Sequence, residues 1–110
     1  MKYLLLIAGT EDRLNGIDRH EAWNTFTQEL VAANKIRGGE RLRPAAAATT
    51  LRLDGARRLL SDGPFAETKE QLGGFYVVEA GNLDEAVEIA SKMPHLQDGG
   101  SVEIRPIWEM

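Results

Sequence analysis

The residues that decide the fold are 62–75, which read DGPFAETKEQLGGF and join two apolar, strand-like segments. Asp62-Gly63-Pro64 predicts a turn, because glycine tolerates unusual backbone angles and proline fixes its own φ. Pro64 also lacks an N–H group, so we expect a strand ladder to stop there. Gly73-Gly74 permits a close backbone approach before the next strand. This connector is longer and more polar than a hairpin needs, and such loops often carry function.

Strands are predicted on both sides of this stretch. Before it, Asp54-Gly55 is a strong hairpin signal between residues 51–53 and 57–61. After it, residues 75–80 predict another strand.

The segment further upstream, residues 36–50, is harder to assign. Residues 41–43 alternate as a strand does, but Pro44 and four alanines follow. The alanine run can be helical in isolation. We favour an extended edge, because residues 49–53 continue it.

Two helices are predicted, each from a cap and an apolar stripe. Asp18 with Glu21, and Asn82 with Glu85, resemble capping boxes. The stripes comprise Trp23, Phe26, Leu30 and Ala33 in the first helix, and Leu83, Ala86, Val87, Ala90 and Met93 in the second. We expect a polar loop over residues 9–16 before the first helix, and Pro94 to end the second.

The two ends of the chain also predict strands. Residues 3–8 are apolar on both alternating faces, which is typical of a central strand covered on both sides. In residues 102–108, the side chains of Val102 and Ile104 are on one face of the strand, and those of Glu103 and Arg105 are on the other.

The order strand, helix, two or three strands, helix, strand predicts an α+β fold with the ferredoxin-like βαββαβ arrangement and an added β-hairpin. One face of the sheet would carry both helices, and the other would stay open. Because the first strand is apolar on both faces, we expect a second copy to cover the open face in a homodimer.

Length and composition bound the class of protein. The 110 residues, 43% of them hydrophobic, fit one domain over residues 1–110 with a single core. The absence of cysteine excludes disulfides and thiolate metal ligands. The apolar start is short and soon followed by Glu11 and Asp12, so we expect no signal peptide. No stretch approaches the ~20 apolar residues of a membrane span, and we expect a soluble cytoplasmic protein.

The net charge of −4 is unevenly distributed. Residues 35–58 hold seven basic side chains against two acidic ones, a net charge of +5 that leaves −9 for the rest. Such a segment can meet an anionic ligand or nucleic acid, or it can be a solvated hairpin with arginines on its outer face. No nucleic-acid-binding motif accompanies it, so we do not expect a nucleic-acid partner.

Residues 62–75 resemble the signature of the DGPF-domain, or YCII-related, family, and the agreement extends to residues 82–86 and 102–107. The resemblance covers nearly the whole chain. It implies a ferredoxin-like fold of the dimeric α/β-barrel type. The biochemical role of such families is largely unassigned. Some relatives lie near, or are fused to, sigma factors of the extracytoplasmic-function type, which implies a link to transcription.

Some distant members are dehydrochlorinases, in which a His–Asp pair is thought to act. His20 lies roughly where that histidine is expected, but the position for the aspartate offers Ala33, Asn34 and Lys35. A neutral Asn cannot stabilise an imidazolium as a carboxylate does, so this mechanism does not transfer. The alternative for His20 is a satisfied histidine at the edge of the apolar stripe. We expect His95, after Pro94, to lie on the surface.

The candidate site residues gather around the central loop. Asp62 and His20 are catalytic candidates, and the candidate ligand contacts are Phe65, Glu67, Lys69 and Tyr76. A carboxylate beside an amine can position a polar ligand, or exchange protons if burial shifts the pKa values. The structural alternatives are that Asp62 caps the turn, that Glu67 and Lys69 pair on the surface, and that Tyr76 is a core residue, as we expect of Trp23 and Phe26.

Two functions follow from these residues. The first is binding of a small polar or anionic molecule in a pocket beside the central loop, with acid–base chemistry of a lyase or isomerase kind. The second is a non-enzymatic interaction module linked to transcription regulation by sigma factors. The sequence contains no phosphate loop, nucleophile elbow or metal-ligand pattern, so we expect neither a metal nor a cofactor.

Overall fold

The computed structural model describes residues 1–64, 66 and 68–109. Its elements are β1 (Lys2–Thr10), α1 (Glu11–Gly16), α2 (His20–Ala32), β2 (Ile36–Arg41), the 3₁₀ turn η1 (Ala45–Ala47), β3 (Thr49–Asp54), β4 (Arg57–Asp62), β5 (Glu70–Glu79), α3 (Leu83–Ala90), the 3₁₀ turn η2 (Pro94–Asp98) and β6 (Ser101–Pro106). Phe65 and Glu67, two of the candidate ligand contacts, lie outside the described residues. Among the residues described, no helix has the length and apolar character needed to cross a membrane.

Four strands form one antiparallel sheet in the order β2-β5-β1-β6, and β3 pairs with β4 in a separate two-stranded sheet. α2 lies between β1 and β2 in sequence, and α3 lies between β5 and β6, so each crossover spans one intervening strand. This is the split βαβ pattern of a ferredoxin-like α+β fold with an added hairpin, which confirms the predicted fold class.

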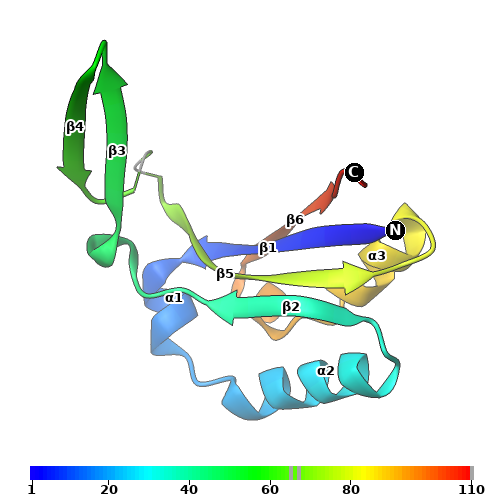
Figure 1. Ribbon diagram of the computed structural model, residues 1–110. Helices are drawn as coiled ribbons and strands as arrows, with labels where there is room; N and C mark the ends of the chain where they lie inside the picture. The colour runs from blue at the N-terminus through cyan, green and yellow to red at the C-terminus, as the bar shows by residue number, and fades with distance from the viewer. Residues whose placement is uncertain (65, 67, 110) are drawn as a thin grey trace.

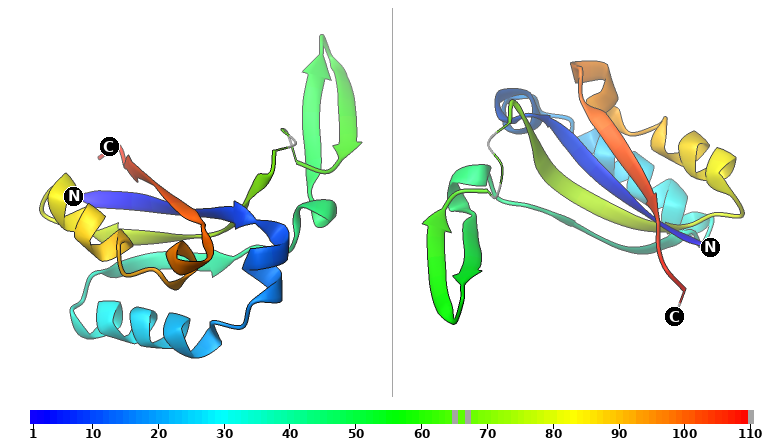
Figure 2. Two further views of the ribbon diagram at one scale, coloured as in Figure 1. Left: turned by 180° about the vertical axis from the view of Figure 1, so that it is seen from behind. Right: turned by 90° about the horizontal axis from the view of Figure 1, so that it is seen from above.

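The core lies between the sheet and the two longer helices, which occupy the same face (Figures 1 and 2). Alternate residues of β1 point to that face, and Tyr3, Leu5 and Ile7 are buried there. They pack against Phe26 and Leu30 of α2 and against Ala86, Ile89 and Ala90 of α3. Leu5 is 0% exposed, and complete burial of such a side chain stabilises the fold by about 2 kcal/mol.

The opposite face of the sheet is also apolar. Leu4 pairs with Val77, and Leu6 pairs with Phe75, so these four side chains share that face. All four are half-buried, and none of the described helices covers them. The two-faced apolar pattern predicted for residues 3–8 is therefore present, but the helices cover only one of its faces.

The glycine pair of the central motif forms a β-bulge in the middle of the sheet. Ile7 pairs with Gly74 while Ala8 pairs with Leu72, so Gly73 is the extra residue. A Cβ atom on Gly73 would lie 2.9 Å from Cδ1 of Leu14, which belongs to α1. The sequence placed the start of this strand at residue 75, but β5 begins at Glu70, because Gly74 and residues 70–72 pair with β1 on the two sides of the bulge.

α1 occupies part of the region where a polar loop was predicted. Glu11 and Asp12 lie in its first turn, where their charges suit the positive end of a helix. Leu14 is its one side chain packed against the core. A six-residue helix with a single apolar contact has no stripe that the sequence could reveal.

The cap predicted for the second of the two longer helices is present, whereas the cap predicted for the first is not. α2 begins at His20 with Arg19 at its N-cap position and without a side-chain cap, and the Oδ1 atom of Asp18 accepts a hydrogen bond from the His20 N–H at 3.0 Å. α3 is capped as predicted, since the Glu85 N–H donates to Asn82 Oδ1 at 2.9 Å. The buried face of α3 includes Ile89, however, while Leu83 and Val87 are 53% and 47% exposed.

Three other sequence expectations are corrected. The alanine run forms the 3₁₀ turn η1, not an extended edge, and the N–H of Ala45 donates to the carboxylate of Glu11. The last strand ends at Pro106, and Trp108 is 88% exposed. In α2, Trp23 is only half-buried and Ala33 is exposed, so the buried part of the stripe is Phe26 and Leu30.

The predicted hairpin is confirmed as β3 and β4, joined at Gly55-Ala56 with Gly55 at φ 62°. It stands away from the rest of the molecule (Figure 1). The radius of gyration is accordingly 15.7 Å, against about 13 Å expected for a compact chain of this length. One face of the hairpin carries Leu51, Leu53 and Leu60, which are 55%, 68% and 60% exposed.

We expect Gly74→Ala to destabilise the sheet. Its Cβ atom would lie 2.8 Å from the backbone oxygen of Glu40 in the paired strand β2, and backbone cannot move aside as a flexible side chain can. Overpacking of this kind costs about 1–3 kcal/mol in the free energy of unfolding. Gly16→Ala is the matched control, because a Cβ atom there meets nothing within 4 Å. Urea denaturation of both variants tests this, and equal stabilities would contradict it.

Candidate functional site

A cavity of about 590 Å³ lies between the helix-covered face of the sheet and the segment that runs from α1 into α2. Its size falls in the range of small-molecule sites, about 300–1,000 Å³. Side chains from β1, α1, α2, β2, β5 and η2 line it. The polar and charged side chains of the lining are Arg13, Asn15, Asp18, Arg19, His20, Thr27, Glu40, Arg41, Tyr76, His95 and Asp98.

Aromatic rings from three elements form one wall of this cavity. The ring of Trp23 in α2 lies nearly parallel to those of Tyr76 in β5 and His95 in η2, with centroid separations of 6.1 and 5.6 Å. Phe26 meets both Trp23 and Tyr76 edge to face. Aromatic pairs at such separations are attractive, so each ring holds its neighbours in place.

The positions of these rings follow from local periodicity. Trp23 and Thr27 are four residues apart and share one face of α2. Tyr76 alternates with Gly74 and Val78 on the helix-covered face of β5. The hydroxyl groups of Thr27 and Tyr76 are 2.6 Å apart and hydrogen-bond each other, which joins the helix to the strand at the cavity wall.

His95 is buried, with 4% of its surface exposed, and this corrects the prediction that it lies on the surface. Pro94 and Met93 are buried beside it, so the turn after α3 packs inward instead of leading out to solvent. The Nε2 atom of His95 lies 2.7 Å from the carbonyl oxygen of Ser101. The backbone at Gly100 is so close that a Cβ atom there would lie 2.5 Å from the Cδ2 atom of His95.

A bidentate ion pair forms part of the cavity lining. The Nε and Nη2 atoms of Arg19 donate to the two carboxylate oxygens of Asp98 at 3.0 and 2.7 Å. The Nη1 atom of Arg13 donates to the backbone carbonyl of the same aspartate at 3.0 Å. The neighbouring Arg19 guanidinium lowers the pKa of the Asp98 carboxyl group. Asp98 therefore holds η2 against α1 and the start of α2.

The rim carries groups that can meet a polar ligand. His20 is exposed, and its Nε2 atom lies 3.4 Å from Nδ2 of Asn24. Arg41 donates a long hydrogen bond of 3.4 Å to Asn15. The side chains of His20 and Arg41 both line the cavity. The rim can therefore offer a titratable imidazole and a guanidinium to the same molecule.

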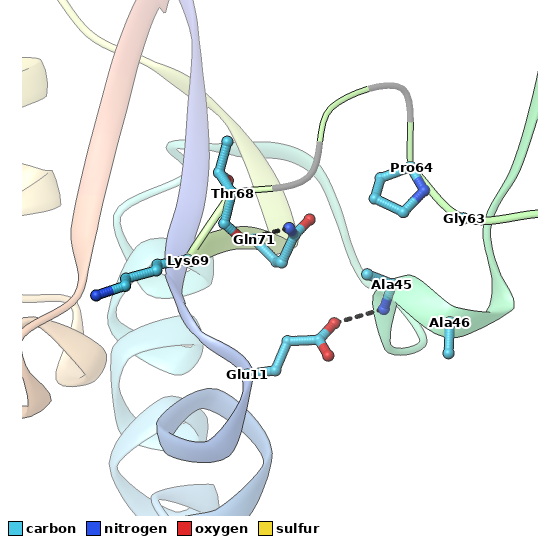
Figure 3. Close-up of a pocket in the computed structure, with 8 residues that line it drawn as sticks. All are labelled: Glu11, Ala45, Ala46, Gly63, Pro64, Thr68, Lys69 and Gln71. Atoms are coloured by element: carbon cyan, nitrogen blue, oxygen red, sulfur yellow. Dashed lines mark hydrogen bonds between the residues drawn. The ribbon is translucent and has the colours of Figure 1, made fainter.

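The structure separates the candidate residues of the central loop from this cavity. Lys69 lines a different hollow of about 380 Å³, formed with Glu11, η1 and the Gly63-Pro64 turn (Figure 3). The Lys69 amine points away from Glu11, whose carboxylate points to Ala45 (Figure 3). Asp62 is exposed at the end of β4 and is part of neither lining.

Of the candidate residues, His20 and Tyr76 are the two that the structure brings together in the larger cavity. The roles of all six residues remain predictions. Sequence reasoning did not find His95, Arg19, Arg41 or Asp98. The one available signal was the polar run Asp18-Arg19-His20 before the first helix. No residue from 33 to 35 lines the cavity, and Lys35 forms an ion pair with Glu85 instead. Within the described part of the chain, no three His, Asp or Glu side chains are grouped so as to hold a metal ion.

Burial lowers the pKa of His95 below its ordinary value of 6.5, although the Ser101 carbonyl and the Asp98 carboxylate oppose this shift. The unfolded chain therefore binds more protons than the folded one just below pH 6.5, and stability falls as the pH drops through that window. We expect this slope in denaturant unfolding between about pH 5 and 8. His95→Gln should flatten it, whereas His20→Gln should keep it. A slope unchanged by His95→Gln would assign the effect to other groups.

Comparison with known proteins gives three results. The family model of the YCII-related domain matches residues 1–110. An uncharacterized protein of Rhizobium meliloti (strain 1021) is 43% identical over 81 residues, which are 73% of this chain and 65% of that protein. The chain thus matches somewhat less than two thirds of that relative's length.

The third result is a solved structure. The 5-chloro-2-hydroxyhydroquinone dehydrochlorinase of Burkholderia phenoliruptrix AC1100, in complex with 2,5-dihydroxybenzoquinone, superposes with a TM-score of 0.60. The alignment covers 99% of this chain and 94% of the enzyme at 21% identity, which shows a shared fold. The family match, together with the motif at residues 62–75, shows that this chain belongs to the YCII-related family.

Proposed function

We propose that this protein binds a small, flat, oxygen-bearing molecule in the cavity between the sheet and α2, and that it can exchange protons with that molecule. The observation that carries the proposal is the cavity wall itself, where the ring of Trp23 lies nearly parallel to the ring of Tyr76 and to the imidazole of His95. Parallel aromatic rings favour a planar ligand, because flat rings stack. Histidine is the side chain best suited to acid–base chemistry near neutral pH.

The charges of the rim support a polar or anionic ligand. Arg41 retains donors beyond its long contact with Asn15, since a guanidinium carries five N–H groups. Arg19, by contrast, is committed to Asp98 through two short hydrogen bonds. Arg41 and His20 are therefore the residues to which we assign first contact with the polar part of the ligand, and Tyr76 supplies a hydroxyl deeper in the cavity.

The solved neighbour supports the ligand class by analogy. That dehydrochlorinase was captured with 2,5-dihydroxybenzoquinone, a flat ring with hydroxyl and carbonyl oxygens. The analogy concerns shape and polarity. We propose no dehydrochlorination for this chain, because residues 33–35 supply no carboxylate to the cavity.

We expect 2,5-dihydroxybenzoquinone and para-nitrophenol, used as probes, to raise the melting temperature of the wild-type protein. Arg41→Met and Tyr76→Phe should each weaken binding about fivefold to tenfold, the effect of one lost hydrogen bond. Lys92→Met, on the exposed surface after α3, is the matched control for removal of a charge. Isothermal titration calorimetry on the four proteins gives the dissociation constants.

Asp62→Asn and Lys69→Met distinguish this cavity from the loop hollow. If these two variants lose affinity while Arg41→Met and Tyr76→Phe keep it, the ligand binds beside the central loop and our assignment is wrong. If neither probe binds the wild-type protein, the proposed ligand class is wrong.

A second candidate is a protein-interaction module, and the hairpin favours it. Every residue from 51 to 62 is exposed, and three leucines of β3 and β4 share one face. A lone two-stranded hairpin is marginally stable in water, so such an arm is expected to pack against a partner. The link to transcription implied by the family resemblance would place a protein of that system on this arm.

We further propose that the protein is a homodimer in which a second copy covers the open face of the sheet. Leu4, Leu6, Phe75 and Val77 form an apolar surface there that no helix of the described chain covers. Apolar surface is stabilised by removal from water at about 25 cal/mol per Å², so a matching surface on another copy is a strong partner.

Light scattering at micromolar concentration should therefore report twice the monomer mass of 12.1 kDa. Leu6→Lys should shift the population to monomers, because it would place a charge in the covered surface. Val31→Lys, on the exposed side of α2, is the control and should leave the mass unchanged. A monomeric wild-type protein would refute the dimer.

A further inference from the structure

We propose that the Nδ1 atom of His95 is the proton acceptor of the cavity, and that the ligand is accordingly a phenol or an enol, with a hydroxyl group that donates to this nitrogen. The inference rests on the proposed function, because it needs a ligand in that cavity. It assigns the proton-accepting role to a buried histidine, where the sequence had pointed to His20 on the rim.

The hydrogen bond to Ser101 determines which nitrogen is free. A backbone carbonyl only accepts, so Nε2 of His95, 2.7 Å from it, carries the hydrogen and donates. Nδ1 of the neutral ring then bears an unshared electron pair. This atom is buried and has no hydrogen-bond partner among the described residues. Buried polar atoms are nearly always paired, so an orphaned acceptor on a residue that lines the cavity calls for a partner that the described residues do not supply.

The hydrogen bond from Nε2 to the Ser101 carbonyl fixes the orientation of the ring. Its Cδ2 edge faces Gly100, since a Cβ atom built on that glycine would lie 2.5 Å from Cδ2. Trp23 stacks along the ring face with a centroid separation of 5.6 Å. Because Nδ1 lies across the ring from Cδ2, the packing against Gly100 directs Nδ1 away from that backbone. The acceptor is thus held in one orientation before any ligand arrives.

The charges around His95 suit a base that is neutral at rest. Asp98 lies on η2, the same turn as His95. Arg19, which precedes α2, pairs with the Asp98 carboxylate, and Arg13 of α1 donates to the backbone carbonyl of Asp98. The other titratable or charged side chains that line the cavity are Asp18, His20, Glu40, Arg41 and Tyr76. Burial lowers the pKa of His95, so the ring is unprotonated near neutral pH and keeps the electron pair on Nδ1. Once it is protonated, the Asp98 carboxylate favours the imidazolium.

The electron pair on Nδ1 selects the chemistry of the ligand. A carboxylate has no proton to offer and would oppose the lone pair, whereas a phenol or an enol donates one. In the transfer step the ligand O–H bond breaks and its electron pair stays on oxygen. The proton forms the new N–H bond at Nδ1, which leaves an imidazolium beside a phenolate or enolate. The aromatic wall accommodates the flat ring or the conjugated enol that such acidity requires.

The first experiment needs no variant. In protein labelled with ¹⁵N at histidine, the Nδ1 resonance of His95 should be that of an unprotonated imidazole nitrogen at neutral pH. Addition of para-nitrophenol should move it toward the protonated position. If the probe binds and shifts the signals of His20 but leaves Nδ1 of His95 unchanged, this inference fails while the proposed function stands. If Nδ1 carries the hydrogen in the free protein, the inference also fails.

The second experiment reads the ligand by absorbance, since the phenolate of para-nitrophenol is yellow. Bound to the wild-type protein, the probe should ionise about one pH unit below the free compound, a tenfold change in its acidity. His95→Gln keeps a donor near Ser101 but removes the acceptor at Nδ1, so it should abolish this shift. His95→Asn keeps an acceptor near Nδ1 and should retain a bound, un-ionised probe. Lys92→Met, on the exposed surface outside the cavity, should preserve the shift, and a shift that survives His95→Gln would refute the role of His95.

Discussion

The antiparallel pairing of β1 with β5 is the constraint on which the rest of the structure depends. β1 lies between β5 and β6 and presents Tyr3, Leu5 and Ile7 to the helices, so it joins both crossovers to one core. The same pairing places Tyr76 opposite Leu5 beneath α2. The bulge at Gly73 then changes the register near the end of the pair, where the cavity opens and α1 packs against the sheet. A slip of one residue would turn Tyr76 to the other face.

The central motif acts on the cavity through its backbone more than through its charges. Gly73 and Gly74 line the cavity and remove the Cβ atoms that would meet Leu14 and Glu40. At the other end of the motif, Gly63 has φ 99° and its N–H donates to Ala48 at 2.7 Å, while Thr50 donates to its carbonyl. Those contacts tie the turn to the base of the hairpin. The motif thereby shapes one cavity with its last glycines and lines a separate hollow with Lys69.

Hydrophobic burial is unevenly shared between the two parts of the chain. The ferredoxin-like unit buries its apolar residues between sheet and helices, whereas β3 and β4 leave all their side chains except Thr50 exposed. The hairpin's backbone ladder is complete, from Thr49 paired with Asp62 to Asp54 paired with Arg57. It therefore has regular secondary structure without a core of its own, and its geometry depends on the turns that join it to β2 and β5.

The sequence by itself determined the class of the fold, because that class depends on local patterns. The alternation in β1, the Asn82 cap, the Asp54-Gly55 turn and the order of the elements all report on neighbours a few residues apart. It also placed His20 and Tyr76 among the site candidates, and both line the cavity. It missed α1, which has one apolar contact, and the 3₁₀ turn of the alanine run, whose first N–H is bound by Glu11 from thirty-four positions away.

Only the tertiary structure decided where the candidate site lies. Arg19 meets Asp98 across seventy-nine positions of sequence, and Trp23 meets His95 across the gap between α2 and η2. Nothing local marks His95 as buried, since its environment comes from α2, Gly100 and Ser101. Asp62 and Lys69 are near each other in sequence, but Asp62 ends β4 in the hairpin, whereas Lys69 lines the hollow beside η1. Periodicity reveals which residues share a face, whereas a cavity is made by side chains that only the packing of distant elements brings together.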